Sequence, residues 1–100
     1  MYFITCFQKL ALADDGFPDL GAERTMGYYS QYKTAEEDLN RNNCDMYEYL
    51  YNYAVIEHIP EGIYQTITSR TFFKFDKEKR GYFPIKEPDF FKNFANIAFG

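Results

Sequence analysis

Few residues of this sequence have side chains suited to covalent or metal chemistry. The 100 residues include one histidine, His58, and two cysteines, Cys6 and Cys44. A closed zinc site takes four Cys or His ligands at short paired spacings, so three candidates predict no such site. A Cys–His nucleophilic pair would use Cys44, because Cys6 lies in an apolar stretch where a thiol is normally inert packing. An enzyme that uses Cys44 and His58 is therefore the third hypothesis, after binding of a protein and binding of a small ligand.

Carboxylates are numerous, but their spacing selects no pair for general acid–base catalysis, which needs two acids held across a cleft. The sequence contains no glycine-rich phosphate loop, no dinucleotide fingerprint and no nucleophile elbow. It therefore predicts no catalytic residue, no metal site and no cofactor.

The window Asp76–Glu87 resembles the calcium-binding loop of an EF-hand. Acids occupy its first and third positions, Gly81 the sixth and Glu87 the twelfth. Arg80, however, falls at a ligand position and would set a cation beside the metal, and the segment before the window is rich in β-branched residues. A charged β-hairpin tip is the simpler interpretation, and calcium binding is kept as an alternative.

Basic residues interleave with aromatic residues near the end of the sequence, a pattern that binders of single-stranded nucleic acids use. The net charge of −4 and the pI of about 4.9 argue against nucleic acid as the partner. The residues concerned are Arg70, Lys74, Lys77, Lys79, Arg80, Lys86 and Lys92, set among Phe72, Phe73, Phe75, Tyr82 and Phe83.

The charges are also unevenly distributed along the chain. Residues 1–69 carry 4 basic and 11 acidic side chains, whereas residues 70–100 carry 7 basic and 4 acidic ones. Such polarity can orient a partner or favour head-to-tail self-association. An unevenly charged, solvated surface is the simpler explanation.

The aromatic content is high, with 10 Tyr and 11 Phe but no Trp. Core filling accounts for the Phe residues, whereas ten buried tyrosines would each need a partner for the hydroxyl group. Four tyrosines recur at every second residue, which is the period of a strand and predicts one face. Together with nearby acids they form the predicted partner-binding set, which comprises Tyr47, Tyr49, Tyr51, Tyr53, Glu36, Glu37, Asp38 and Glu48.

The first half of the chain predicts two strands and a helix. Residues 2–8 are apolar on both sides, as in a strand inside a sheet. Residues 14–19 have turn chemistry, and a second strand is predicted over 24–32, with Met26, Tyr28, Ser30 and Tyr32 on one face. Gly27 suggests a bulge there. The capping box Thr34–Glu37 predicts a helix over 35–43, with acids 36–38 in its first turn.

The second half predicts three strands and a second helix. The first strand covers 45–58, or 51–59 if the helix continues further. Residues 71–76 and 81–85 form a hairpin, and a short helix follows Glu87-Pro88, where proline suits the first turn. The order β-β-α-β-β-β-α predicts a single α+β domain, with an antiparallel sheet of four to five strands and two short helices on one face.

Five stretches resemble small uncharacterised proteins of low-GC Gram-positive bacteria and of their phages or mobile elements. They are residues 1–6, 24–28, 43–48, 53–57 and 93–100. The resemblance implies a bacterial or phage setting in the cytoplasm and carries over no functional residue.

The favoured hypothesis is a stoichiometric binding protein that docks on a protein partner or on itself, for example as a homodimer. Inhibition of a host defence enzyme is one form that such binding takes in mobile elements, by analogy alone. The second hypothesis is a small-ligand or nucleotide sensor. No secretory signal and no apolar run of membrane-spanning length is found, so we expect a cytoplasmic protein without a membrane partner.

Overall fold

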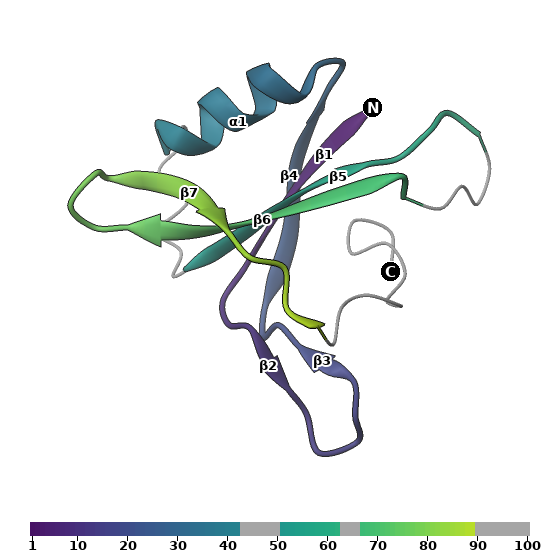
Figure 1. The fold of residues 1–100 in the computed structure, drawn as a ribbon, viewed down its shortest axis with the longest axis vertical. Helices are drawn as coiled ribbons and strands as arrows, with labels where there is room; N and C mark the ends of the chain where they lie inside the picture. Colours follow the sequence, from purple (N-terminus) through teal and green to yellow (C-terminus); the bar gives the residue numbers. More distant parts are fainter. Residues whose placement is uncertain (43–50, 63–66, 90–100) are drawn as a thin grey trace.

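The computed structural model describes residues 1–42, 51–62 and 67–89. Within them, a five-stranded antiparallel sheet has the strand order β4-β1-β5-β6-β7 (Figure 1). The strands of this sheet are β1 (Tyr2–Phe7), β4 (Glu23–Tyr29), β5 (Tyr53–His58), β6 (Ser69–Asp76) and β7 (Gly81–Ile85).

Strand β1 lies inside the sheet, as its two apolar sides predict. It pairs with β4 along one edge and with β5 along the other. Residues 4–7 are all buried, so both faces of the strand are covered. The β5–β6 ladder then continues the sheet, and β7 forms its second edge.

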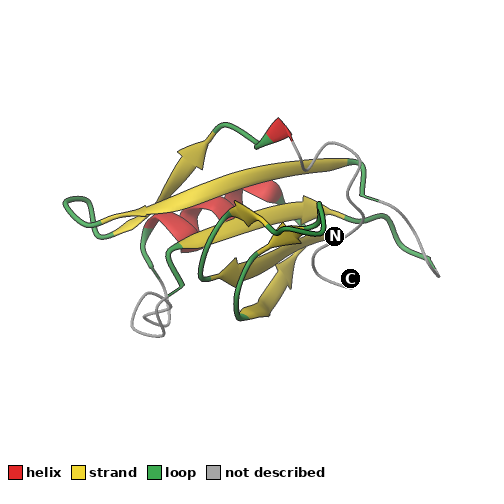
Figure 2. Cartoon of the chain, turned by 90° about the horizontal axis from the view of Figure 1, so that it is seen from below, coloured by secondary structure: helices red, strands yellow, loops and turns green. Residues whose placement is uncertain are grey.

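Helix α1 (Tyr32–Asn40) lies across one face of the sheet and contacts β1, β4, β5 and β7 (Figure 2). It begins three residues before the predicted start, so Thr34 is inside the helix and the predicted capping box is wrong. Gln31 is the N-cap residue, and its side chain makes no capping hydrogen bond. Tyr32 adds a third apolar position to Ala35 and Leu39 at helical spacing, and its packing on the core accounts for the extra turn.

The predicted bulge in β4 is present. Ile4 of β1 faces Gly27 and the next residue, Thr5, faces Thr25, so Met26 is the additional residue. The insertion changes which side chains share a face, because strand alternation restarts beyond it. Met26 packs on the helix side, whereas Tyr28 contacts Phe3 on the other side, so the predicted common face of residues 26 and 28 is wrong.

The predicted hairpin is confirmed as β6 and β7, joined by residues 77–80. Asp76 Oδ1 accepts hydrogen bonds from the backbone N–H groups of Glu78 and Lys79, which shapes the turn. Arg80 has a positive φ of 56°. Strands stand on both sides of this turn, so the window 76–87 does not form the helix–loop–helix frame of an EF-hand.

A second, two-stranded sheet lies between β1 and β4 in sequence; its second strand falls within residues 14–19, which were predicted as a turn, and its first strand precedes them. Strands β2 (Ala11–Leu12) and β3 (Pro18–Asp19) pair with each other alone. In Figure 1 this hairpin projects from the end of the main sheet. We call residues 10–19 the arm.

Two hydrophobic clusters occupy the two faces of the sheet. On the helix side, Ala35 and Leu39 pack on residues of β1, β5, β6 and β7. On the opposite side, the buried residues are Phe7, Leu20, Val55 and Phe72.

The observed fold confirms the α+β class and a five-stranded antiparallel sheet. One helix is present in the described part of the chain, where two were predicted, and the order of elements agrees only roughly. Most of the second predicted helix falls on residues 90–100, outside the described ranges.

Candidate protein-binding site

The first residue of the chain is fixed at the end of the β1–β5 ladder. The N-terminal ammonium group of Met1 donates a hydrogen bond of 3.0 Å to the Ile59 carbonyl oxygen, and the Ile59 N–H donates one of 2.9 Å to the Met1 carbonyl oxygen. These two bonds add one residue pair to the ladder. They place the Met1 side chain beside the segment that leaves β5.

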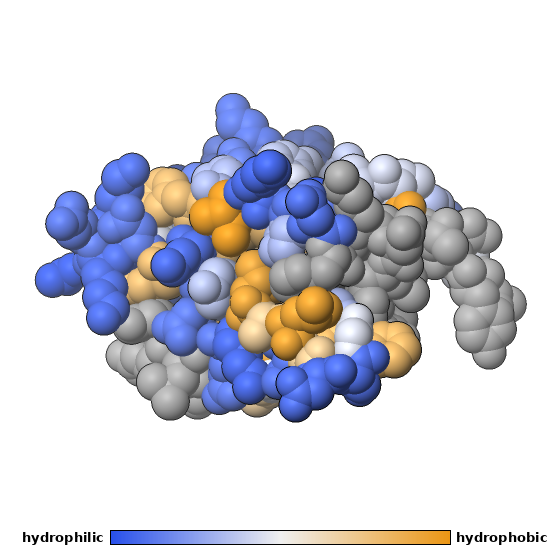
Figure 3. Space-filling view, turned by 60° about the horizontal axis from the view of Figure 1, so that its bottom comes forward, coloured by the Kyte–Doolittle hydropathy of each residue, from blue (hydrophilic) through white to orange (hydrophobic). Residues whose placement is uncertain are grey.

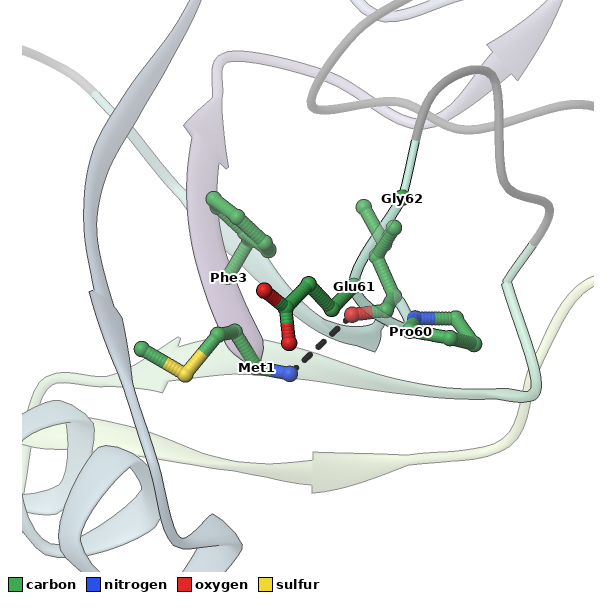
Figure 4. A pocket seen from close by; sticks show the side chains of 6 residues that line it. Met1, Phe3, Pro60, Glu61 and Gly62 are labelled. Carbon is green, nitrogen blue, oxygen red and sulfur yellow. Dashed lines mark hydrogen bonds between the residues drawn. The ribbon is translucent and has the colours of Figure 1, made fainter.

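A hollow of about 430 Å³ lies at this end of the sheet. Figure 4 shows Met1, which precedes β1, and Phe3 of β1 facing the turn of Pro60, Glu61 and Gly62. Gly62 has a φ of 138°, which is open to glycine and strained for other residues, so the turn that closes the hollow depends on it. Apart from Glu61 and backbone groups, the lining is apolar. We call these residues, together with Ile59, the amino-terminal hollow.

Tyr28 of β4 extends the apolar surface beyond the hollow. Its ring centroid lies 5.8 Å from that of Phe3, and 64% of the residue is exposed. Met1 is 41% exposed. The bulge at Met26 determines this arrangement, because without the additional residue Tyr28 would point to the helix side.

A buried ion pair lies beside Phe3 on the same face. Phe3 faces Glu57 across the β1–β5 ladder, and Glu57 faces Arg70 across the β5–β6 ladder. The Arg70 Nε and Nη2 atoms donate hydrogen bonds of 3.1 and 3.0 Å to Glu57 Oε2. Glu57 is 0% exposed, and the side chain of Arg70 is 3% exposed. One row of cross-strand neighbours therefore runs over β4, β1, β5 and β6. Its members are Tyr28, Phe3, Glu57 and Arg70.

Two further carboxylates lie near this pair. Glu87 is 3.8 Å from Arg70 Nη1. Partial burial and the negative charge of Glu57 raise the pKa of Glu23 above its usual value. The pair therefore lies in an acidic neighbourhood, in which Arg70 supplies the compensating charge.

The predicted acids of α1 divide between tyrosine contacts and solvent. Asp38 accepts a hydrogen bond from the Tyr29 hydroxyl, and Glu36 accepts one of 3.1 Å from the Tyr32 hydroxyl. Burial raises the pKa of Tyr32. Glu37 is exposed. All three lie on the helix side and contribute nothing to the amino-terminal hollow. They occupy the middle of α1 instead of its first turn.

Of the predicted tyrosine stripe, the structure describes Tyr51 and Tyr53, whereas Tyr47, Tyr49 and the acid Glu48 lie outside the described residues. Tyr51 packs on the helix-side cluster, and its carbonyl oxygen accepts a hydrogen bond of 2.5 Å from the Tyr82 hydroxyl. Tyr53 packs on the opposite cluster and stacks on Phe7. The two described rings thus do not share one face, because the strand begins only at Tyr53.

Of the residues considered for catalysis, Cys6 and His58 have structural roles in packing and hydrogen bonding. Burial raises the pKa of the Cys6 thiol to about 12, so the thiolate needed for attack is not formed near neutral pH. His58 stacks on Tyr2 at 4.4 Å, and its Nδ1 atom forms a hydrogen bond with the Thr68 hydroxyl. Cys44 is outside the described residues. Within the described part, no group of three or more Cys, His, Asp or Glu side chains is placed to hold a metal ion.

The aromatic residues proposed for stacking on nucleic-acid bases are mostly inaccessible. Phe72, Phe73 and Tyr82 are 0% exposed, and Arg70 is committed to Glu57. Phe83 and Phe75 remain half-buried. The exposed basic residues of the β6–β7 hairpin are thus flanked by few rings that a base can reach.

The amino-terminal hollow was missed at the level of sequence because its parts come from three separate segments. Residues 1–3, 28 and 59–62 meet only through the register of β1 with its two neighbours. One signal was available: Gly27 marked a bulge, and a bulge redirects the aromatic residue that follows it.

No family model matches the chain, and neither curated proteins nor solved structures provide a match. In the described residues, no helix combines the length and the apolar character needed to cross a membrane.

Proposed function

We propose that this protein is a stoichiometric protein-binding module whose amino-terminal hollow receives an apolar side chain of a partner protein. The observation that carries the proposal is the gathering of exposed apolar groups at a concave site. Met1 and Tyr28 are two of the four large hydrophobic residues most exposed in the described part; Met1 lines the hollow, and Tyr28 contacts Phe3, which also lines it. Exposed apolar surface around a concave site is typical of interfaces.

The charge at the rim defines the chemistry of the partner further. Glu61 is exposed and lines the hollow, and one N–H of the Met1 ammonium group donates to the Ile59 carbonyl oxygen, while its positive charge remains at the edge of the hollow. A partner with a basic residue next to its apolar anchor would pair with Glu61. Such a contact at the rim favours orientation and rate of association more than affinity.

The same proposal includes a cytoplasmic setting in a bacterial cell. The reduced, buried Cys6 is in keeping with a reducing compartment. An enzyme that binds nucleic acid has a basic surface of the kind that Glu61 would meet. Inhibition of a host defence enzyme is therefore a specific form of the proposal, supported by analogy and by this charge match.

A small ligand is the second candidate for the hollow. Its volume of about 430 Å³ lies within the roughly 300–1,000 Å³ of small-molecule sites. A nucleotide, however, would bring its phosphates towards Glu61, and the lining offers them the Met1 ammonium group but no basic side chain. A thermal-shift series with nucleotides tests this candidate, and stabilisation by any of them would favour it over the protein partner.

The test of the main proposal compares two aromatic residues of equal exposure. Tyr28 and Phe17 are both 64% exposed, but Phe17 lies on the arm. A partner is first captured from cells that carry the protein, identified and purified. Calorimetry then measures its affinity for wild type, Tyr28→Ala and Phe17→Ala. We expect Tyr28→Ala to lose at least about tenfold in affinity, as truncation of an aromatic anchor does, with an unchanged melting temperature.

A second variant tests the rim. Glu61→Arg places a cation where we expect the partner's own basic residue, so it should slow association and reduce its dependence on salt. If Phe17→Ala weakens binding while Tyr28→Ala and Glu61→Arg leave it unchanged, the partner uses another surface and the proposal is wrong.

A further inference from the structure

The arm is firmly attached to the main sheet at its base. The backbone N–H of Gln8 donates to the carbonyl oxygens of Leu20 and Ala22 at 3.1 and 3.2 Å, and the side-chain Oε1 of Gln8 accepts a hydrogen bond from the Ala22 N–H. Lys9 pairs with Asp19 at 2.9 Å. The arm is therefore held in a defined direction, although its two short strands form a ladder of only two residue pairs.

The tip of the arm presents apolar and acidic side chains together. A turn is closed by a hydrogen bond of 2.8 Å from the Ala13 N–H to the Phe17 carbonyl oxygen, with Gly16 at a φ of 87°. Leu12 and Phe17 are 54% and 64% exposed. Figure 3, in which the lower end of the molecule comes forward, shows apolar surface bordered by hydrophilic side chains. The tip also carries the exposed acids Asp14 and Asp15.

A second hollow, on the β6–β7 hairpin, has the opposite charge. Its volume is about 450 Å³. Phe83, Pro84 and Ile85 supply apolar lining. The charged lining residues are Lys74, Lys79 and Asp76, and the Asp76 carboxylate accepts two backbone hydrogen bonds of the turn. Lys79 Nζ lies 4.8 Å from the centroid of the Phe83 ring. Lys74 Nζ lies 5.9 Å from that of Tyr53. Residues 74–86 carry five basic and two acidic side chains, a net charge of +3. We call this site the hairpin hollow.

We propose that the arm of one copy docks in the hairpin hollow of a second copy of this chain. Leu12 and Phe17 would contact the apolar lining, while Asp14 and Asp15 would face Lys74 and Lys79. Charge complementarity favours this occupant, because the arm contains three acids and no basic residue.

The contact has to join two molecules. In Figure 1 the arm projects from the lower end of the sheet and the turn of the β6–β7 hairpin points to the left, so the two tips of one copy point in different directions. A head-to-tail contact of this kind is heterologous and closes into a ring or extends as a filament, whereas a reciprocal exchange of arms between two copies forms an isologous two-fold dimer. The attraction between exposed charges weakens at high salt.

Sedimentation velocity of the full chain over a range of concentrations tests the proposal. We expect wild type to self-associate at low salt, and at least about tenfold more weakly at 1 M NaCl, where the Debye length falls to about 3 Å. The arm variant Asp14→Lys/Phe17→Ser and the hairpin variant Lys74→Glu/Lys79→Glu should each be monomeric. All four residues are exposed, so both variants should keep the wild-type circular dichroism spectrum.

Mixing the two variants is the decisive measurement. The arm variant retains an intact hairpin hollow, and the hairpin variant retains an intact arm, so an equimolar mixture should form a one-to-one dimer that cannot grow further. A wild type that stays monomeric at low salt up to millimolar concentration overturns the proposal. So does self-association that survives in either variant, or a mixture that remains monomeric.

This proposal is independent of the proposed function, because it uses none of the residues of the amino-terminal hollow. Tyr28→Ala should weaken the foreign partner and leave self-association unchanged, whereas Phe17→Ala should do the reverse. The failure of either proposal can therefore be recognised without reference to the other.

Discussion

At the scale of single residues, the buried ion pair of Glu57 and Arg70 carries a large desolvation cost within the sheet. Removing two charges from water costs several kcal/mol per ion, and a buried pair recovers this only with good hydrogen-bond geometry. Arg70 donates twice to one carboxylate oxygen, which meets that condition. The pair thereby fixes the register of β5 against β6 beside the amino-terminal hollow.

Breaking the pair should be costly. Glu57→Gln leaves the charge of Arg70 buried without its main partner, so we expect a loss of about 3 kcal/mol or more in the free energy of unfolding, measured in urea. Glu87→Gln is the control, because its side chain is 36% exposed and 3.8 Å from Arg70, and it should cost less than about 1 kcal/mol.

Replacing both members separates charge from packing. A Glu57→Leu/Arg70→Met variant removes both desolvation costs and should be more stable than Glu57→Gln. Equal losses in Glu57→Gln and Glu87→Gln would show that the buried geometry does not hold in solution.

At the scale of elements, the packing of α1 on β7 depends on a residue without a side chain. A Cβ atom at Gly81 would lie 1.8 Å from the backbone carbonyl oxygen of Asn40, the last residue of the helix. Backbone cannot move aside as a flexible side chain can. The end of the helix and the start of the strand therefore have to separate if any larger residue is introduced.

Gly81→Ala should accordingly destabilise the protein by about 1–3 kcal/mol or more, the range expected of overpacking. Gly27→Ala is a matched control within the same sheet, since a Cβ there meets nothing within 4 Å. It should be neutral or stabilising by about 0.4–1 kcal/mol, through a less flexible unfolded chain. Thermal unfolding of both variants measures the contrast, and a neutral Gly81→Ala would contradict the packing.

The elements also show how far sequence patterns reach. Turn residues, strand alternation and Gly27 are local signals, and they correctly predict β1, the β6–β7 hairpin and the bulge. The start of α1 was misplaced because Tyr32 is drawn into the helix by its contact with the core, which the capping pattern cannot reveal. The ion pair and the amino-terminal hollow depend on register between strands far apart in the sequence, which the local patterns of single segments do not specify.

At the scale of the whole molecule, stability should be unevenly distributed. β1, β5 and β6 each have a strand on both sides, and buried residues lie along them on the two faces of the sheet. The arm has two residue pairs and an exposed tip. Local opening is easiest where few buried contacts have to be broken.

Hydrogen exchange followed by mass spectrometry should reflect this division. We expect the amides of β1 and β5 to exchange only through global unfolding, and those of the arm to exchange by local opening, orders of magnitude faster. Similar protection in both regions would contradict the attachment of the arm through its base alone.

The strand order has a consequence for the protein as it is synthesised. β1 pairs with β5, whose last residue, His58, follows Phe7 by about fifty positions in the sequence. At roughly 5–20 residues per second, a ribosome takes about 3–10 s to cover that distance. During this interval β1 can pair with β4 alone, and the edge of β1 that later pairs with β5 stays open. A nascent chain of this protein therefore exposes an incomplete sheet edge for seconds, and chaperones that recognise extended apolar segments would meet it there.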